Sequence, residues 1–90
     1  MAQPLFEKVA FIGLGLIGSS LARVMLAENL SRHIVASTRS EKTLQDALEL
    51  GLIEQGFNNP IDAVQGADLV VLALPVQATE KVLRLIQPHL

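Results

Sequence analysis

The sequence predicts an α/β fold built on a doubly wound parallel sheet. Short apolar runs alternate along the chain with segments whose apolar residues recur at helical spacing. A glycine-rich hexapeptide, GLGLIG at positions 13–18, joins the first apolar run to the first helical segment. The run at residues 69–74 is apolar throughout, which is typical of a strand covered by helices on both faces. Because strands that alternate with helices are joined by right-handed crossovers, the strands are expected to lie parallel in one sheet.

The first strand is expected at residues 9–12 and the first helix at residues 16–28. The apolar residues of this helix recur at helical intervals and are expected to face the sheet; they are Ile17, Leu21, Val24 and Met25.

The second strand is expected at residues 33–37. Ser40 is the predicted N-cap of a helix that ends at Leu50, and Gly51 supplies the left-handed position that often follows a helix. Its buried stripe is expected to consist of Leu44, Ala47 and Leu48. The stretch that follows has the weakest pattern and leaves open a short third strand around residues 53–55.

A short helix is predicted at residues 61–65. Asn59 is a good cap, Pro60 suits the first helical position, and Gly66 ends the helix.

The apolar run at residues 69–74 predicts a strand at the centre of the sheet, ended by Pro75. A final helix is expected at residues 77–87 and is stopped by Pro88. Its apolar face is expected to consist of Ala78, Val82, Leu85 and Ile86.

Composition argues against several classes of function. Half of the 90 residues are apolar, and seven Lys and Arg are scattered among nine acidic residues, so no basic face for nucleic acid is expected. Three Phe are the only aromatic residues, which removes the stacking platform of single-strand binders. Cysteine is absent, and His33 and His89 are far apart in the sequence, so no metal site is expected.

Nothing in the sequence favours a membrane or an oxidising compartment. The run from Lys8 to Ala22 could be taken for a signal peptide, but three glycines interrupt it and Arg23 continues the helical register. We therefore expect a cytoplasmic protein with no membrane partner.

The glycine hexapeptide indicates a dinucleotide-binding turn between a strand and a helix. Gly13 would make the tight turn, Gly15 would let the backbone approach a pyrophosphate, and Gly18 would let the helix pack close to the strand. The phosphates would lie on the free N–H groups at the positive end of that helix. The fold class thus becomes a Rossmann-type doubly wound sheet.

The residue that meets the adenosine ribose in such a fold lies about 20 residues past the last glycine. Here it is Thr38, where proteins selective for NAD carry Asp or Glu. A 2′-phosphate would gain charge-assisted hydrogen bonds from Arg39, helped by the hydroxyls of Ser37, Thr38 or Ser40. NADP is therefore the preferred cofactor, although Arg39 could stack on adenine in either cofactor, which leaves NAD open.

Several segments together resemble the prephenate and arogenate dehydrogenases, the NAD(P)-dependent enzymes of tyrosine biosynthesis. The stretch VAFIGLGLIGSSLA at residues 9–22 is similar to the opening of that family, and ALELGLI at residues 47–53 is similar to one of its helix ends. ADLVVLALPV at residues 67–76 is similar to its fourth strand and is shared with other relatives of 6-phosphogluconate dehydrogenase. Thr38 stands where the family usually has an acid, as in its NADP-using members.

The resemblance implies an enzyme that transfers hydride from prephenate or arogenate to nicotinamide, with loss of the ring carboxyl as carbon dioxide. It implies cofactor contacts but no catalytic residue in this chain, because the family's catalytic histidine lies further on and His89 does not match it. The expected contacts are Gly13, Gly15, Leu16, Ile17 and Gly18 at the pyrophosphate, Thr38, Arg39 and Ser40 at the adenosine, and Leu74, Pro75 and Val76 along the cleft at the end of the fourth strand.

The resemblance also implies that residues 1–90 are the N-terminal, incomplete part of one dinucleotide-binding domain. The isolated chain is therefore expected to be inactive, and a homodimer is expected only with a further C-terminal domain. Two other interpretations stay open. One is the cofactor domain of another reductase related to 6-phosphogluconate dehydrogenase, and the other is a non-catalytic nucleotide-binding module.

Overall fold

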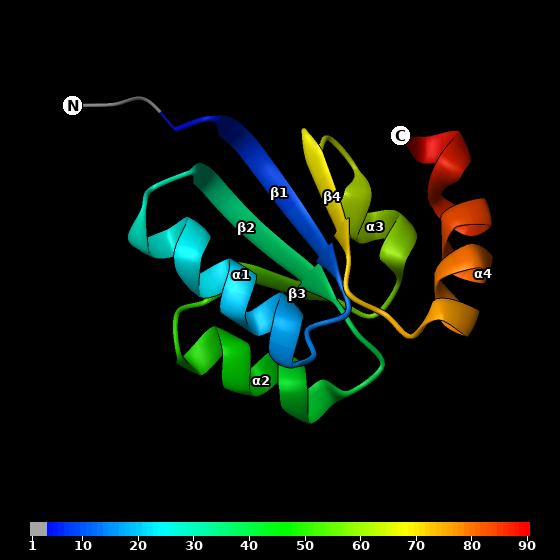
Figure 1. Ribbon diagram of the computed structural model, residues 1–90, viewed down its shortest axis with the longest axis horizontal. Coiled ribbons are helices and arrows are strands. Elements are labelled where there is room, and N and C mark those ends of the chain that lie inside the picture. Colours follow the sequence, from blue (N-terminus) through cyan, green and yellow to red (C-terminus); the bar gives the residue numbers. More distant parts are fainter. Residues whose placement is uncertain (1–3) are drawn as a thin grey trace.

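The computed structural model describes residues 4–90, apart from the side chains of Leu16 and Ile17. Four parallel strands form one sheet in the order β3-β2-β1-β4. Helices α1 and α2 cover one face of this sheet, while α3 and α4 lie on the other (Figure 1). The predicted α/β class with a doubly wound parallel sheet is confirmed.

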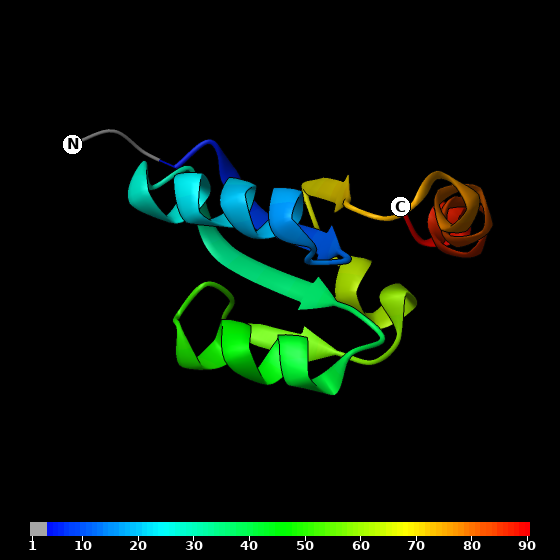
Figure 2. The ribbon, with the colours of Figure 1, turned by 60° about the horizontal axis from the view of Figure 1, so that its bottom comes forward.

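The centre of the sheet is β1 (Phe6–Ile12), which pairs with β2 (Ser31–Ser37) on one side. Alternation along β1 divides the core into two layers. Val9 and Phe11 pack under α1 and α2, whereas Ala10 and Ile12 pack under α3 and α4. In a turned view, α1 and α2 lie to the left of β4 and α4 lies to its right (Figure 2).

Both central strands begin earlier than the sequence predicted. The N–H of Phe6 donates to the carbonyl of Leu30 at 3.0 Å, and Phe6 pairs with Ser31, so the ladder starts in a partly exposed region. Apolar runs mark only the buried part of a strand, which explains the short predictions.

Helix α1 (Leu16–Ala27) forms as predicted, but its buried face differs. Ala22 and Met25 face the sheet, whereas Leu21 is exposed and Val24 is 51% exposed, so the prediction that both face the sheet is wrong. Gly18 is held close to the loop after β4, and this contact fixes the rotation of the helix. The expectation for Ile17 lies outside the described side chains.

Helix α2 (Glu41–Glu49) is capped by Ser40, whose Oγ accepts from the N–H of Thr43 at 3.2 Å. Leu44 and Ala47 are buried as predicted, but Leu48 is exposed, which corrects the third member of the stripe. Gly51 follows the helix with φ +74°.

The third strand, β3 (Gln55–Phe57), lies slightly later than the sequence suggested. Ile53 is buried, but pairing with β2 begins only where the N–H of Glu54 donates to the carbonyl of Ile34 at 2.7 Å. The chain therefore becomes buried at Ile53, before it begins to pair with β2.

Helix α3 (Pro60–Val64) begins as predicted, with Asn59 Oδ1 accepting from the N–H of Ile61 at 2.9 Å. Gly66, at φ +71°, follows the helix. Its buried residues are Ala63 and Val64.

Strand β4 (Leu69–Leu72) pairs with β1 and lies at the edge of the described sheet. The prediction of a central strand is therefore wrong for this sheet, and the side chains of β4 are only half-buried. An apolar run indicates that both faces of a strand are covered by other elements, but it does not indicate the position of the strand within the sheet.

Helix α4 (Val76–Ile86) continues into a 3₁₀ turn, η1 (Gln87–His89). Ile86 is buried and Val82 is half-buried, as expected, whereas Leu85 is exposed, contrary to the prediction. Among residues 4–90, no helix combines the length and apolar character that crossing a bilayer requires.

Candidate nucleotide-binding site

The glycine turn between β1 and α1 is held against two neighbouring loops. Gly13 has φ +88°, and its N–H donates to the carbonyl of Ser37 at 2.7 Å. A Cβ on Gly13 would collide with the carbonyl oxygen of Ala73, which follows β4. Only glycine meets both conditions, because a side chain would be strained and would have no space.

Gly18 brings α1 close to the same loops. A Cβ at this position would lie 3.0 Å from the Cβ of Ala73 and 3.2 Å from the carbonyl oxygen of Gly13. The first turn of α1 therefore packs against the residue that follows β4. The sequence predicted that Gly18 would let the helix pack close to the sheet.

Gly15 differs from its two neighbours in the motif because it faces open space. No atom outside its immediate neighbours lies within 4 Å of where its Cβ would be, although it starts α1. As the N-cap it offers no side-chain hydrogen bond, and no acidic residue lies in the first turn. Free backbone N–H groups and a positive helix end next to open space suit a phosphate group.

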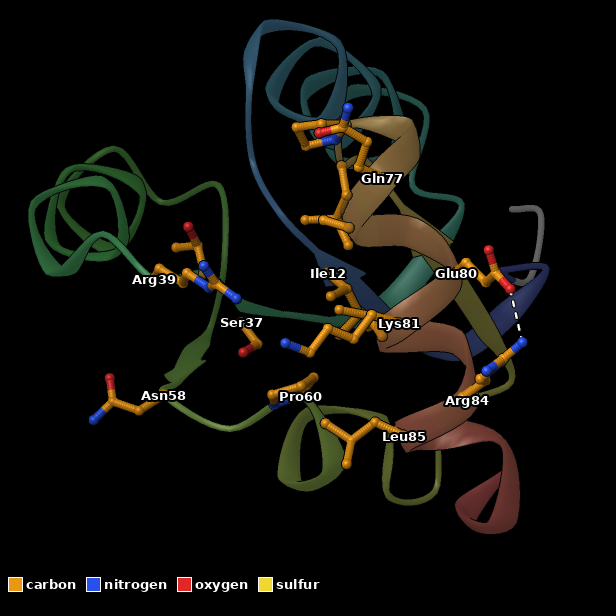
Figure 3. A pocket seen from close by; sticks show the side chains of 15 residues that line it. Ile12, Ser37, Arg39, Asn58, Pro60, Gln77, Glu80, Lys81, Arg84 and Leu85 are labelled. Atoms are coloured by element: carbon orange, nitrogen blue, oxygen red, sulfur yellow. Dashed lines mark hydrogen bonds and ion pairs between the residues drawn. The ribbon is translucent and has the colours of Figure 1, made fainter.

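A cavity of about 990 Å³ opens at the carboxyl ends of the strands. Ile12 from β1, Ser37 from β2 and Leu74 after β4 contribute to its wall, and α4 closes the opposite side (Figure 3). This end of a parallel sheet is where ligands bind in doubly wound folds. The other lining residues are Thr38, Arg39, Asn58, Pro60, Pro75, Gln77, Ala78, Glu80, Lys81, Val82, Arg84 and Leu85.

The segment after β2 has the polar character that the sequence suggested. Thr38 is half-buried, and its Oγ1 accepts from the N–H of Ser40 at 3.4 Å. Ser40, by contrast, is not part of the cavity lining, and its hydroxyl caps α2. Arg39 is exposed and reaches the cavity wall.

Carboxylates are scarce around the cavity. Among the described lining residues the one acid is Glu80, whose Oε1 lies 2.8 Å from the Nη2 of Arg84. Figure 3 shows this pair on the outer side of α4. Within the described lining, no carboxylate lies on the side of the cavity that Arg39 occupies (Figure 3).

The structure brings most of the sequence-predicted residues to one end of the sheet. Thr38, Arg39, Leu74 and Pro75 line the cavity, whereas Val76 is 88% exposed and lies outside its lining. The side chains of Leu16 and Ile17 lie outside the described part, although their backbone starts α1. Cofactor contacts by these residues stay predictions.

Sequence reasoning missed the wall that α4 and the loop after β3 provide. Gln77, Lys81 and Leu85 recur at every fourth position of α4 and line the cavity, and Asn58 joins them from the loop. Gln77 and Lys81, two polar residues one turn apart on the predicted helix, could have indicated this wall.

The sequence matches the model of a known protein family. The matched family is described as "NADP oxidoreductase coenzyme F420-dependent", and the match spans residues 8–90. The chain belongs to this family.

Three members of the tyrosine-pathway dehydrogenases are similar to the chain. Cyclohexadienyl dehydrogenase of Zymomonas mobilis is 41% identical over 73 residues, which are 81% of this chain and 25% of the relative. Prephenate dehydrogenase of Bacillus subtilis is 32% identical over 73 residues, 81% of this chain and 20% of the relative. The crystal structure of Synechocystis arogenate dehydrogenase superposes with a TM-score of 0.79 at 29% identity, covering 91% of this chain and 28% of that chain.

A further solved structure supports the fold. Prephenate dehydrogenase from A. aeolicus, in complex with hydroxyphenyl propionate and NAD+, gives a TM-score of 0.84 at 22% identity and covers 93% of this chain and 30% of that chain. The chain is thus homologous to a part of the prephenate and arogenate dehydrogenases, as the sequence motifs indicated. It spans between a fifth and a quarter of the length of the curated relatives it matches.

Proposed function

We propose that this chain is the cofactor-binding part of an NAD(P)-dependent dehydrogenase that acts on prephenate or arogenate. The intact enzyme would oxidise and decarboxylate its substrate in the cytoplasm, and its dimer contacts and catalytic groups would come from outside these residues. The names of the relatives support the substrate class, and the family description supports a pyridine nucleotide.

The open space at Gly15 is the observation that carries the proposal. Gly13 and Gly18 are both in tight contact with neighbouring loops, so packing alone explains glycine at these two positions. Packing does not explain glycine at position 15, where a Cβ would meet no atom of the protein. A pyrophosphate on the N-terminus of α1 accounts for both the missing side chain and the missing cap.

NADP is the preferred cofactor in this proposal. Thr38 replaces the acid that would repel a 2′-phosphate, and Arg39 at the cavity wall supplies a guanidinium for it. The nicotinamide ring, when bound, accepts the hydride, and the protein contributes position and electrostatics. Gly15 with the backbone of Leu16 and Ile17 would hold the pyrophosphate, and Leu74 and Pro75 would line the cleft.

Turnover by the intact gene product tests the substrate class. With NADP+ present, we expect prephenate or arogenate to be oxidised with release of carbon dioxide, and reduced cofactor to accumulate in step. A protein that binds NADP but turns over neither substrate would contradict the proposal.

The family description favours one alternative, an oxidoreductase that exchanges hydride between NADP and coenzyme F420. The cofactor end of the site would be the same, so binding of NADP does not separate the two functions. Reduction of F420 by NADPH, measured beside the prephenate and arogenate assays, separates them, and activity with F420 alone would favour the alternative.

A further inference from the structure

Lys81 lines the cavity at the carboxyl end of the sheet. It is an exposed residue of α4 and directly precedes the half-buried Val82. In Figure 3 the side chain of Lys81 points away from the outer surface of α4 and towards Ser37, at the end of β2.

No partner inside the described chain accounts for this position. Within residues 4–90, Lys81 makes neither an ion pair nor a hydrogen bond through its side chain. Glu80, its neighbour in sequence, pairs with Arg84 on the other side of the helix. The one acid of the described lining, Glu80, is paired with Arg84, so the unpaired ammonium group of Lys81 adds to a net positive charge around the cavity.

A second cation faces the same space from the opposite wall. Arg39 reaches the cavity from the segment after β2, and within residues 4–90 it also has no ion-pair partner. Figure 3 shows Arg39 and Lys81 on opposite sides of Ser37. Two cations on facing walls, without an intervening acid, are suited to an anionic group placed between them.

We propose that Lys81 is a specificity-determining residue that binds the 2′-phosphate of NADP together with Arg39. This inference rests on the proposed function, because it assumes that an adenine dinucleotide occupies the cavity. In the proposed function the pyrophosphate lies at Gly15, and none of the three glycines of the turn lines the cavity that Lys81 enters. The 2′-phosphate is the one remaining anion of NADP, and NAD has none there.

The test compares two ligands that differ only in this phosphate. Adenosine 2′,5′-bisphosphate and AMP are titrated into the intact protein by calorimetry, first unchanged and then as Lys81→Met, which keeps the length of the side chain and removes its charge. We expect Lys81→Met to weaken the bisphosphate by about tenfold or more, as for a lost charge-assisted hydrogen bond, and to change AMP by less than about twofold.

Two further variants make the result specific. Arg39→Ala is expected to show the same selective loss, because it binds the same group. Lys8→Met is the matched control; Lys8 lies in β1 towards the amino end of the sheet, where its Nζ donates to the carbonyl of Gln65 at 2.6 Å, so both affinities should stay unchanged.

The outcomes distinguish this inference from the proposed function. If Lys81→Met leaves bisphosphate binding intact, or weakens AMP equally, Lys81 does not read the 2′-phosphate, whereas a selective loss in Arg39→Ala would still support the NADP preference. If the unchanged protein binds neither adenosine ligand nor NADP, the proposed function itself fails.

Discussion

At the scale of single residues, the three glycines of the turn have separable roles. Gly13 and Gly18 are required by contacts inside the protein, whereas Gly15 borders open space. The tight turn at Gly13 and the close packing at Gly18 were predicted from the sequence, but their shared contact with Ala73 was not, because it comes from a distant part of the chain. The role of Gly15 at a pyrophosphate stays a prediction. The caps at Ser40 and Asn59 were predictable because they depend on local geometry.

Substituting two of the glycines separates folding from binding. Gly13→Ala should lower the free energy of unfolding by about 2 kcal/mol or more, because φ +88° strains alanine and its methyl group meets Ala73. Gly15→Ala should unfold at nearly the original urea concentration but bind NADP about tenfold or more weakly, a loss of about 1.4 kcal/mol. Unchanged NADP affinity in Gly15→Ala would show that the pyrophosphate does not bind at this turn.

The direction of the Lys81 side chain could not be predicted from the sequence. Its sequence context is that of an ordinary exposed lysine, and its direction depends on how α4 packs against the sheet. Ile86 and Val82 fix this packing, and they do so through contacts with residues far away in the sequence. A pattern within one helix does not contain those partners.

At the scale of elements, the rotation of α1 is the feature that hydrophobicity predicted incorrectly. Leu21 and Val24 are more apolar than Ala22, yet Ala22 is buried and they are exposed. The small side chains of Gly18 and Ala22 allow α1 to approach the sheet, so close packing decides the buried face. Apolar periodicity gives the presence of a helix more reliably than its rotation.

Alanine substitutions on two sides of α1 test this rotation. Met25→Ala should lower the free energy of unfolding by about 2–4 kcal/mol, because Met25 is 5% exposed and its loss leaves a cavity. Val24→Ala, one position earlier on the exposed side, should change it by no more than about 0.5 kcal/mol. The comparison uses urea denaturation of both variants, and the reverse order would contradict the observed rotation.

At the scale of the whole molecule, the candidate site is assembled from segments that the sequence keeps apart. The glycine turn, the segment after β2 and the loop after β4 meet at one end of the sheet because all four strands run in the same direction. The parallel arrangement was predictable from the alternation of strands and helices. The edge position of β4 was not, because strand order depends on long-range pairing that no single run of residues reports.

The most direct test of the whole account is the affinity of the intact protein for its cofactor. Dissociation constants for NADP and NAD, measured by calorimetry at one salt concentration, should show that both dinucleotides bind and that NADP binds about tenfold or more tightly. Thr38→Asp places a carboxylate beside Arg39 and should reverse that order. Failure to bind either dinucleotide, or tighter binding of NAD by the unchanged protein, would contradict the account.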